Sequence, residues 1–178
     1  AEDASSEEEK ISILHKLGAE LVETAKDYVR ATDVYGEILR MSPEDEEAQE
    51  GLLALYRRDQ RWTEVADMLA RKAERLSDGA DGVSVRIELA EIHEQHLDAP
   101  EPAVDLHIQV LDIDTQNERA VAGLERLLSR TERVVDIAVR LKPRYESAGN
   151  WDGVANMTQI LVRTEQDSER REELLLQL

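Results

Sequence analysis

The chain has 178 residues, a net charge of −18 and no cysteine, which excludes disulfides, thiolate chemistry and cysteine-ligated metals. Binding a nucleic-acid backbone requires a basic patch, and this sequence offers only isolated pairs such as Arg57-Arg58 and Arg170-Arg171. No apolar run approaches the roughly 18 residues of a transmembrane helix, and the acidic N-terminal stretch lacks the pattern of a signal peptide. We therefore expect no nucleic-acid partner, no membrane partner and a cytoplasmic location.

The composition favours an all-α fold. Hydrophobic residues make up 41% and charged residues 35%, with only four Pro, eight Gly and no Phe. High charge with few turn residues is typical of helices that have one buried and one solvated face. A chain of this length accommodates about ten helices arranged as hairpins.

The first helix is predicted over residues 6–24, after a disordered acidic tail at residues 1–6. Its apolar stripe includes Ile11, Leu14 and Leu17. Gly18 follows in the helix interior, where glycine costs about 1 kcal/mol relative to alanine, so a close helix approach is expected there.

Two further helices, over residues 26–41 and 43–58, are predicted from stripes that recur every three or four residues. Ser42-Pro43 separates them. Proline suits the first turn of a helix because it lacks an N–H group, so Ser42 is predicted to be the N-cap of the second of these helices.

The remaining helices follow the same periodicity, interrupted by polar corners. Pro143 lies inside one of them by pattern and is expected to kink or weaken it. The expected ranges are 62–76, a helix carrying 85–93 after a corner at 77–82, a helix carrying 103–111 after a corner at 98–102, 117–129, 132–147, 151–164 and a last helix from about 167.

The sequence repeats itself at two offsets without gaps. The first offset places Ala31 on Ala103, Tyr35 on His107 and Gly51 on Gly123, whereas the second places Tyr56 on Tyr145 and Trp62 on Trp151. Internal repetition at a fixed offset is the signature of a helical solenoid. The second offset spans five helices, so either the hairpin alternation breaks around residues 117–150 or the larger repeat contains five helices.

Ala31, Tyr35, Ile38 and Pro43 have the spacing of the second helix of a tetratricopeptide repeat, and residues 10–178 resemble that family. The openings at Trp62 and Trp151 resemble those of divergent bacterial members. The resemblance implies a right-handed superhelix of antiparallel helices, a single repeat domain over residues 7–178, and a concave groove that binds a protein or peptide without chemistry of its own.

By the family's register, the first helix of each hairpin lines the groove. The arginines in this set could form forked bonds with a partner's carboxylates, although each position can equally be a solvated helix face. The tentative groove residues are Glu20, Glu23, Glu50, Arg57, Arg58, Glu91, Gln95, Arg126 and Arg130.

Other candidate sites compete with plainer structural roles. His93, His96 and His107 could together suit a zinc ion, but His93 and His107 occupy positions where the repeat places aromatic core residues. Trp62 and Trp151 are expected to wedge between hairpins, with an exposed partner anchor as the alternative.

The function expected is a non-enzymatic scaffold without a metal or cofactor. The acidic surface favours a basic partner. A structural spacer without a ligand is the main alternative, and a helical enzyme or metal-binding domain is a third. The chain stops on Leu174-Leu175-Leu176-Gln177-Leu178, and solenoid ends need polar capping helices. We therefore expect a fragment of a longer array, or self-association through this end.

Overall fold

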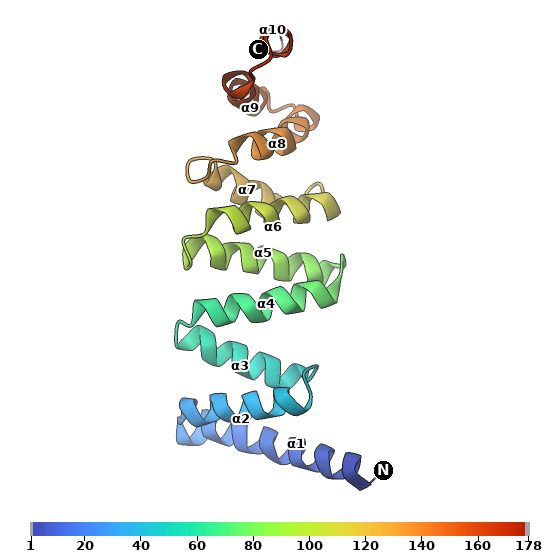
Figure 1. The fold of residues 1–178 in the computed structure, drawn as a ribbon, viewed down its shortest axis with the longest axis vertical. Coiled ribbons are helices and arrows are strands. Elements are labelled where there is room, and N and C mark those ends of the chain that lie inside the picture. The colour runs from blue at the N-terminus through green and yellow to red at the C-terminus, as the bar shows by residue number, and fades with distance from the viewer. Residues whose placement is uncertain (1, 177–178) are drawn as a thin grey trace. The chain divides into compact units, whose positions relative to one another are not determined.

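The computed structural model describes residues 2–176, with side chains from residue 6 onward, and every regular element in that part of the chain is a helix. The all-α prediction is confirmed (Figure 1). The elements are α1 (Glu2–Glu20), the π-helix η1 (Leu21–Ala25), α2 (Tyr28–Met41), α3 (Glu46–Arg58), α4 (Trp62–Leu76), α5 (Ala80–Gln95), α6 (Pro100–Ile113), α7 (Glu118–Leu127), α8 (Val134–Ala148), α9 (Trp151–Thr164) and α10 (Ser168–Leu175).

The chain divides into two units, residues 1–68 and 69–178, with the boundary inside α4. In unit 1, α2 packs against both α1 and α3. Its core includes Ala31, Tyr35 and Ile38. The predicted tail at residues 1–6 lies partly outside the described residues, and that tail and the single domain over 7–178 stay predictions.

Unit 2 is built by the same rule, since each helix from α5 to α10 packs against its neighbour in sequence. Contacts also join α5 to α7 and α6 to α8. Its core runs through these helices and includes Ile87, Leu124, Ile137 and Met157. Among the described residues, the core of each unit is shared by more than two helices, which fits a helical-repeat architecture.

Most predicted helix limits are confirmed, and the limits of α4 and α9 are those predicted. The predicted N-cap Ser42 is wrong. Its backbone N–H donates to Ile38 O at 2.7 Å, so Ser42 closes α2. The cap of α3 is Asp45, whose side chain accepts from Ala48 N at 2.9 Å. The Asp45 side chain stands in capping geometry three residues before that N–H, a position that Ser42 cannot reach.

The helix bounds follow the first sequence offset, the one that places Tyr35 on His107. It carries α2 (Tyr28–Met41) onto α6 (Pro100–Ile113), and α4 (Trp62–Leu76) onto α8 (Val134–Ala148). Each such period therefore holds four helices. Within residues 117–150, α7 and α8 follow one another and are in contact; whether the hairpin alternation continues there stays open. Pro143 lies inside α8, as predicted.

A π-helix after α1 was not predicted. The sequence suggested one helix as far as residue 24, but α1 passes into η1 at Leu21, and Lys26 then adopts a left-handed φ of 55°. A π-turn accommodates one extra residue, so the buried Leu21 keeps its place in the core. Separately, among the described residues no helix has the length and apolar character needed to cross a membrane.

Candidate functional site

Flat rings on one helix lie directly against glycines on the next. In unit 1, the ring of Tyr35 on α2 lies between Gly18 of α1 and Gly51 of α3, where an added Cβ would approach the ring to 2.9 Å and 2.8 Å. Such distances are below van der Waals contact, so only glycine permits this helix approach. The close approach predicted at Gly18 is confirmed.

Unit 2 repeats this arrangement. His107 of α6 lies against Gly123 of α7, where a Cβ would come within 2.2 Å of its Nε2 atom, and Tyr145 of α8 lies against Gly153 of α9, with 2.7 Å to its ring. We call these ring–glycine contacts joints. The first sequence offset carries the Tyr35 joint onto the His107 joint, since it also places Gly51 on Gly123.

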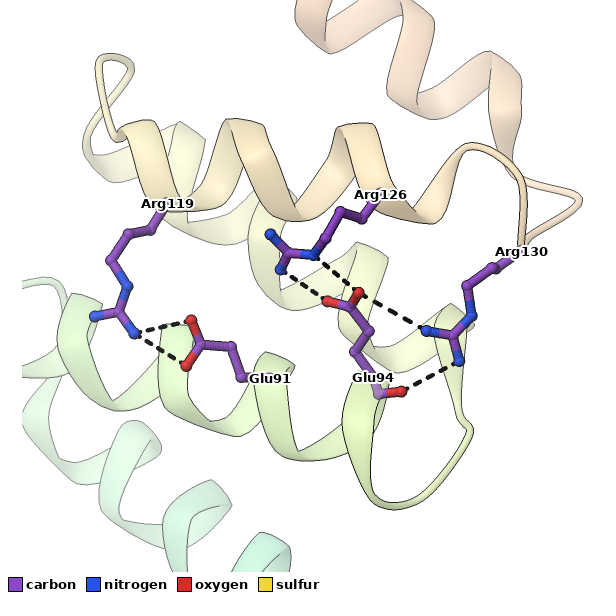
Figure 2. Close-up of polar contacts among 5 residues, drawn as sticks. All are labelled: Glu91, Glu94, Arg119, Arg126 and Arg130. Carbon is purple, nitrogen blue, oxygen red and sulfur yellow. Dashed lines mark hydrogen bonds and ion pairs between the residues drawn. The ribbon is translucent and has the colours of Figure 1, made fainter.

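Charged side chains from α5, α7 and the turn after α7 form a cluster in unit 2 (Figure 2), which we call its charged face, and several of these charges act on His107. Arg126 donates from Nε and Nη2 to the two carboxylate oxygens of Glu94, at 3.0 Å and 2.9 Å. Arg130 donates to the backbone oxygen of Glu94 at 3.2 Å and to Asp98 at 2.9 Å. Arg119 holds Glu91 at 2.9 Å.

Glu94 is the centre of this cluster. It is only 6% exposed, and the hydrogen bond from Arg126 lowers its pKa against the opposing effect of burial. The side chain of Arg126 is in turn 48% exposed. The arrangement is a forked ion pair between a buried carboxylate and a partly exposed arginine. Such a pair fixes the position of α7 on α5 more than it adds stability.

Similar pairs continue between α6 and α8. Arg133 pairs with Asp105, Arg140 lies 2.7 Å from Asp112, and Arg144 donates to Thr115 O at 3.0 Å. The partners of Arg119 and Arg133 stand 28 residues earlier. Polar contacts thus connect α5 to α7 and α6 to α8, at a nearly constant register.

Of the expected groove residues of unit 1, Glu23 acts on the Tyr35 joint. The pKa of Tyr35 is raised by burial and by the charges of Glu47 and Glu23. Glu20 and Glu50 are exposed on the neighbouring turns of α1 and α3. His15 of α1 lies 3.0 Å from Asp45 and 3.5 Å from Glu47.

The expected arginines of unit 1 lie at the end of α3. Arg58 places its guanidinium 3.5 Å from the ring centroid of Tyr28 on α2, and it also pairs with Asp59. Arg57 is half-buried. The guanidinium of Arg58 is therefore held within unit 1 by its stacking on Tyr28 and its pairing with Asp59.

In unit 2 the structure brings together Arg126, Arg130 and the helix that carries Glu91 and Gln95. The arginine forks predicted to face a partner bind Glu94 and Asp98 of the same chain. Their role in partner binding stays a prediction. Sequence reasoning missed Glu94, because its place on the core side of α5 is set by the packing of α7.

The three histidines do not assemble. In the described part of the chain no group of three or more His, Asp or Glu is placed to hold a metal ion. His107 instead fills the ring position of its joint, completely buried, with neither ring nitrogen hydrogen-bonded. The aromatic-core interpretation of His107 is confirmed.

The two tryptophans differ. Trp151 is 69% exposed, so the prediction that it wedges between hairpins is wrong. It begins α9 directly after the turn at Gly149, with the cap at Asn150, and in that first turn its indole points away from the core. Trp62 is half-buried.

A pocket of about 410 Å³ lies among α8, α9 and α10. Its lining combines the apolar side chains of Val135, Leu161 and Leu174 with polar and charged side chains. Beyond it, Leu175 and Leu176 are 50% and 88% exposed, while residues 177 and 178 of the expected self-associating end lie outside the described residues.

Comparison with models of known protein families and with curated proteins finds no match to this chain.

Proposed function

We propose that the protein is a non-enzymatic helical-repeat module that binds a protein or peptide partner. The observation that carries this proposal is the pair of equivalent joints, Tyr35 with Gly51 and His107 with Gly123, related by the first sequence offset. Open arrays of this kind build extended surfaces from successive helices. The resemblance to tetratricopeptide repeats adds a right-handed superhelix and a concave groove to the proposal. The cytoplasmic location expected from the sequence also stays part of it.

The partner proposed is basic. The chain carries 40 acidic against 22 basic residues, and such an excess attracts cationic ligands over long distances. Around the Tyr35 joint, Glu20, Glu23 and Glu50 are exposed on successive first helices. We name these three residues the acidic face of unit 1, and propose that it binds lysine- or arginine-rich segments.

A direct test measures binding of a lysine-rich helical peptide by fluorescence anisotropy. The triple variant Glu20→Lys, Glu23→Lys, Glu50→Lys should weaken binding at least tenfold, because each rim charge contributes to steering and affinity. Affinity of the wild type should fall as salt rises. A glutamate-rich peptide of equal length should bind neither protein.

The matched control reverses three exposed charges outside the acidic face: Asp33→Lys, Glu74→Lys and Asp81→Lys. It changes the net charge equally. If both triple variants lose affinity to the same extent, the peptide is attracted by the net charge of the chain, and the assignment of binding to the acidic face of unit 1 is wrong.

A structural spacer is the second candidate, favoured by one observation. Arg126 and Arg130 bind Glu94 and Asp98 within the chain, so the charged face of unit 2 is internally satisfied. A spacer predicts that the lysine-rich peptide shows no saturable binding.

A further inference from the structure

His107 is a titratable ring placed where the repeat has a tyrosine. Its side chain is completely buried, and both ring nitrogens lack a hydrogen-bond partner. Nε2 lies directly over Gly123, where even a Cβ would come within 2.2 Å. No space remains in this joint for a water molecule beside that nitrogen.

Taking up a proton would place an unsolvated cation in this joint. The neutral ring avoids the cost of burying a charge, and burial accordingly lowers the pKa of His107 to about 4 from its ordinary 6.5. In the unfolded or opened chain, water reaches the ring and the ordinary value returns.

Charges on the adjacent helices do not remove this cost. Glu94 and Glu91 on α5 favour the protonated ring, whereas Arg126 and Arg119 on α7 oppose it. Both carboxylates are already bound to those arginines. On α8, which also packs on α6, Arg133 and Arg140 pair with the exposed Asp105 and Asp112 of α6. No carboxylate is hydrogen-bonded to the imidazole.

We propose that the packing of α6 against α7 opens when His107 takes up a proton, and that the equivalent packing of α2 against α3 lacks this response. The sign follows from proton linkage. The opened state binds one more proton than the closed state between pH 6.5 and about 4, so stability of this packing falls as pH falls through that window.

Unit 1 provides the internal contrast. Its ring is Tyr35, which stays protonated and neutral throughout this range, since its pKa is raised above the ordinary 10.0. Carboxylates with lowered pKa, such as Glu94, lose their charge only below the ordinary 4.5. Between about pH 6.5 and about pH 5 the response therefore isolates histidine from the acidic residues.

One other histidine of unit 2 has a buried ring nitrogen without a hydrogen-bond partner. In unit 1 the same is true of Nδ1 of His15 on α1, whose Nε2 lies 3.0 Å from Asp45. His93 on α5 is half-buried, with Nδ1 unpartnered, and burial lowers its pKa as well. Its share must be separated from that of His107. The exposed His96 serves as a control for simple loss of an imidazole.

The test is amide hydrogen exchange of α6 and α7 at about pH 6.5 and about pH 5, corrected for intrinsic exchange, with α2 and α3 as the internal reference. In the wild type, the opening constant of α6 and α7 should rise by close to tenfold per pH unit. His107→Phe should reduce this rise in the opening constant to the part contributed by His93. His93→Leu should remove only that smaller part. His96→Gln should leave the rise unchanged.

A second measurement stands even if His107→Phe folds poorly. Nuclear magnetic resonance of the imidazole protons should show His107 remaining neutral in the folded chain at about pH 5. The proposal is overturned if His107 titrates near pH 6.5 without opening, if α2 and α3 open in parallel with α6 and α7, or if His107→Phe keeps the whole pH response.

Discussion

At the scale of single residues, the role of a buried side chain in this protein depends on which residue of the next helix it contacts. The sequence pattern predicted His107 at the ring position of the repeat, and the structure confirms this, because His107 and Tyr35 meet equivalent glycines. The sequence did not identify Glu94. Whether a carboxylate on α5 is buried depends on where Arg126 of α7 reaches, 32 residues away, and that distance in the chain carries no local pattern.

Glu94→Gln should destabilise unit 2 by about 1–2 kcal/mol. It leaves the shape but removes the charge that accepts two bonds from Arg126, and the half-exposed arginine side chain limits the loss. Because the pKa of Glu94 is lowered in the folded chain, its contribution is present at neutral pH and lost as pH falls below the ordinary 4.5.

Urea midpoints at neutral and acid pH measure this difference. Glu91→Gln is the matched control, since Glu91 pairs with the more exposed Arg119 and should cost less. Equal losses in the two variants would show that the forked pair does not depend on its burial.

At the scale of helices, periodicity predicted where each one lies, and caps decided where it starts. The apolar stripe of α3 was visible in the sequence, but two capping candidates stand close together before it. Ser42 and Asp45 are both plausible by type. Asp45 stands three residues before Ala48 and accepts a hydrogen bond from its backbone N–H, so the helix begins at Glu46. The π-turn at η1 likewise has no sequence pattern that distinguishes it from a helix end.

Asp45→Ala should therefore cost about 1 kcal/mol of stability, as loss of an N-cap does, whereas Ser42→Ala should change stability by a few tenths at most. Asp45→Asn separates the cap from the ion pair that Asp45 makes with His15, since asparagine also caps. Thermal melts of the three variants measure this. A greater loss of stability in Ser42→Ala than in Asp45→Ala would indicate that Ser42 is the N-cap of this helix, as the sequence predicted.

At the scale of the whole chain, internal repetition was the strongest sequence signal, and the helix bounds follow its first offset. Repetition could not predict which surface carries the charges, because surface residues vary freely between periods: the charges of Glu23 and Glu47 act on Tyr35, whereas the charge of Glu94, which is held by arginines, acts on His107. The exposure of Trp151 was not predictable from the repeat either, since an apolar residue in the first turn of a helix can face the core or the solvent.

The repeat account is tested by replacing glycines. Gly51 and Gly123 face rings at equivalent joints, with Cβ distances of 2.8 Å and 2.2 Å, whereas Gly36 has nothing within 4 Å. All three lie inside helices, where alanine alone should stabilise by about 0.5–1 kcal/mol.

The most direct measurement is the denaturation midpoint of Gly36→Ala, Gly51→Ala and Gly123→Ala. We predict that Gly36→Ala gains stability, while the two joint variants each lose about 1–3 kcal/mol through overpacking. If all three variants gain stability alike, the rings do not set the helix spacing, and the account of a chain held together by equivalent joints is contradicted.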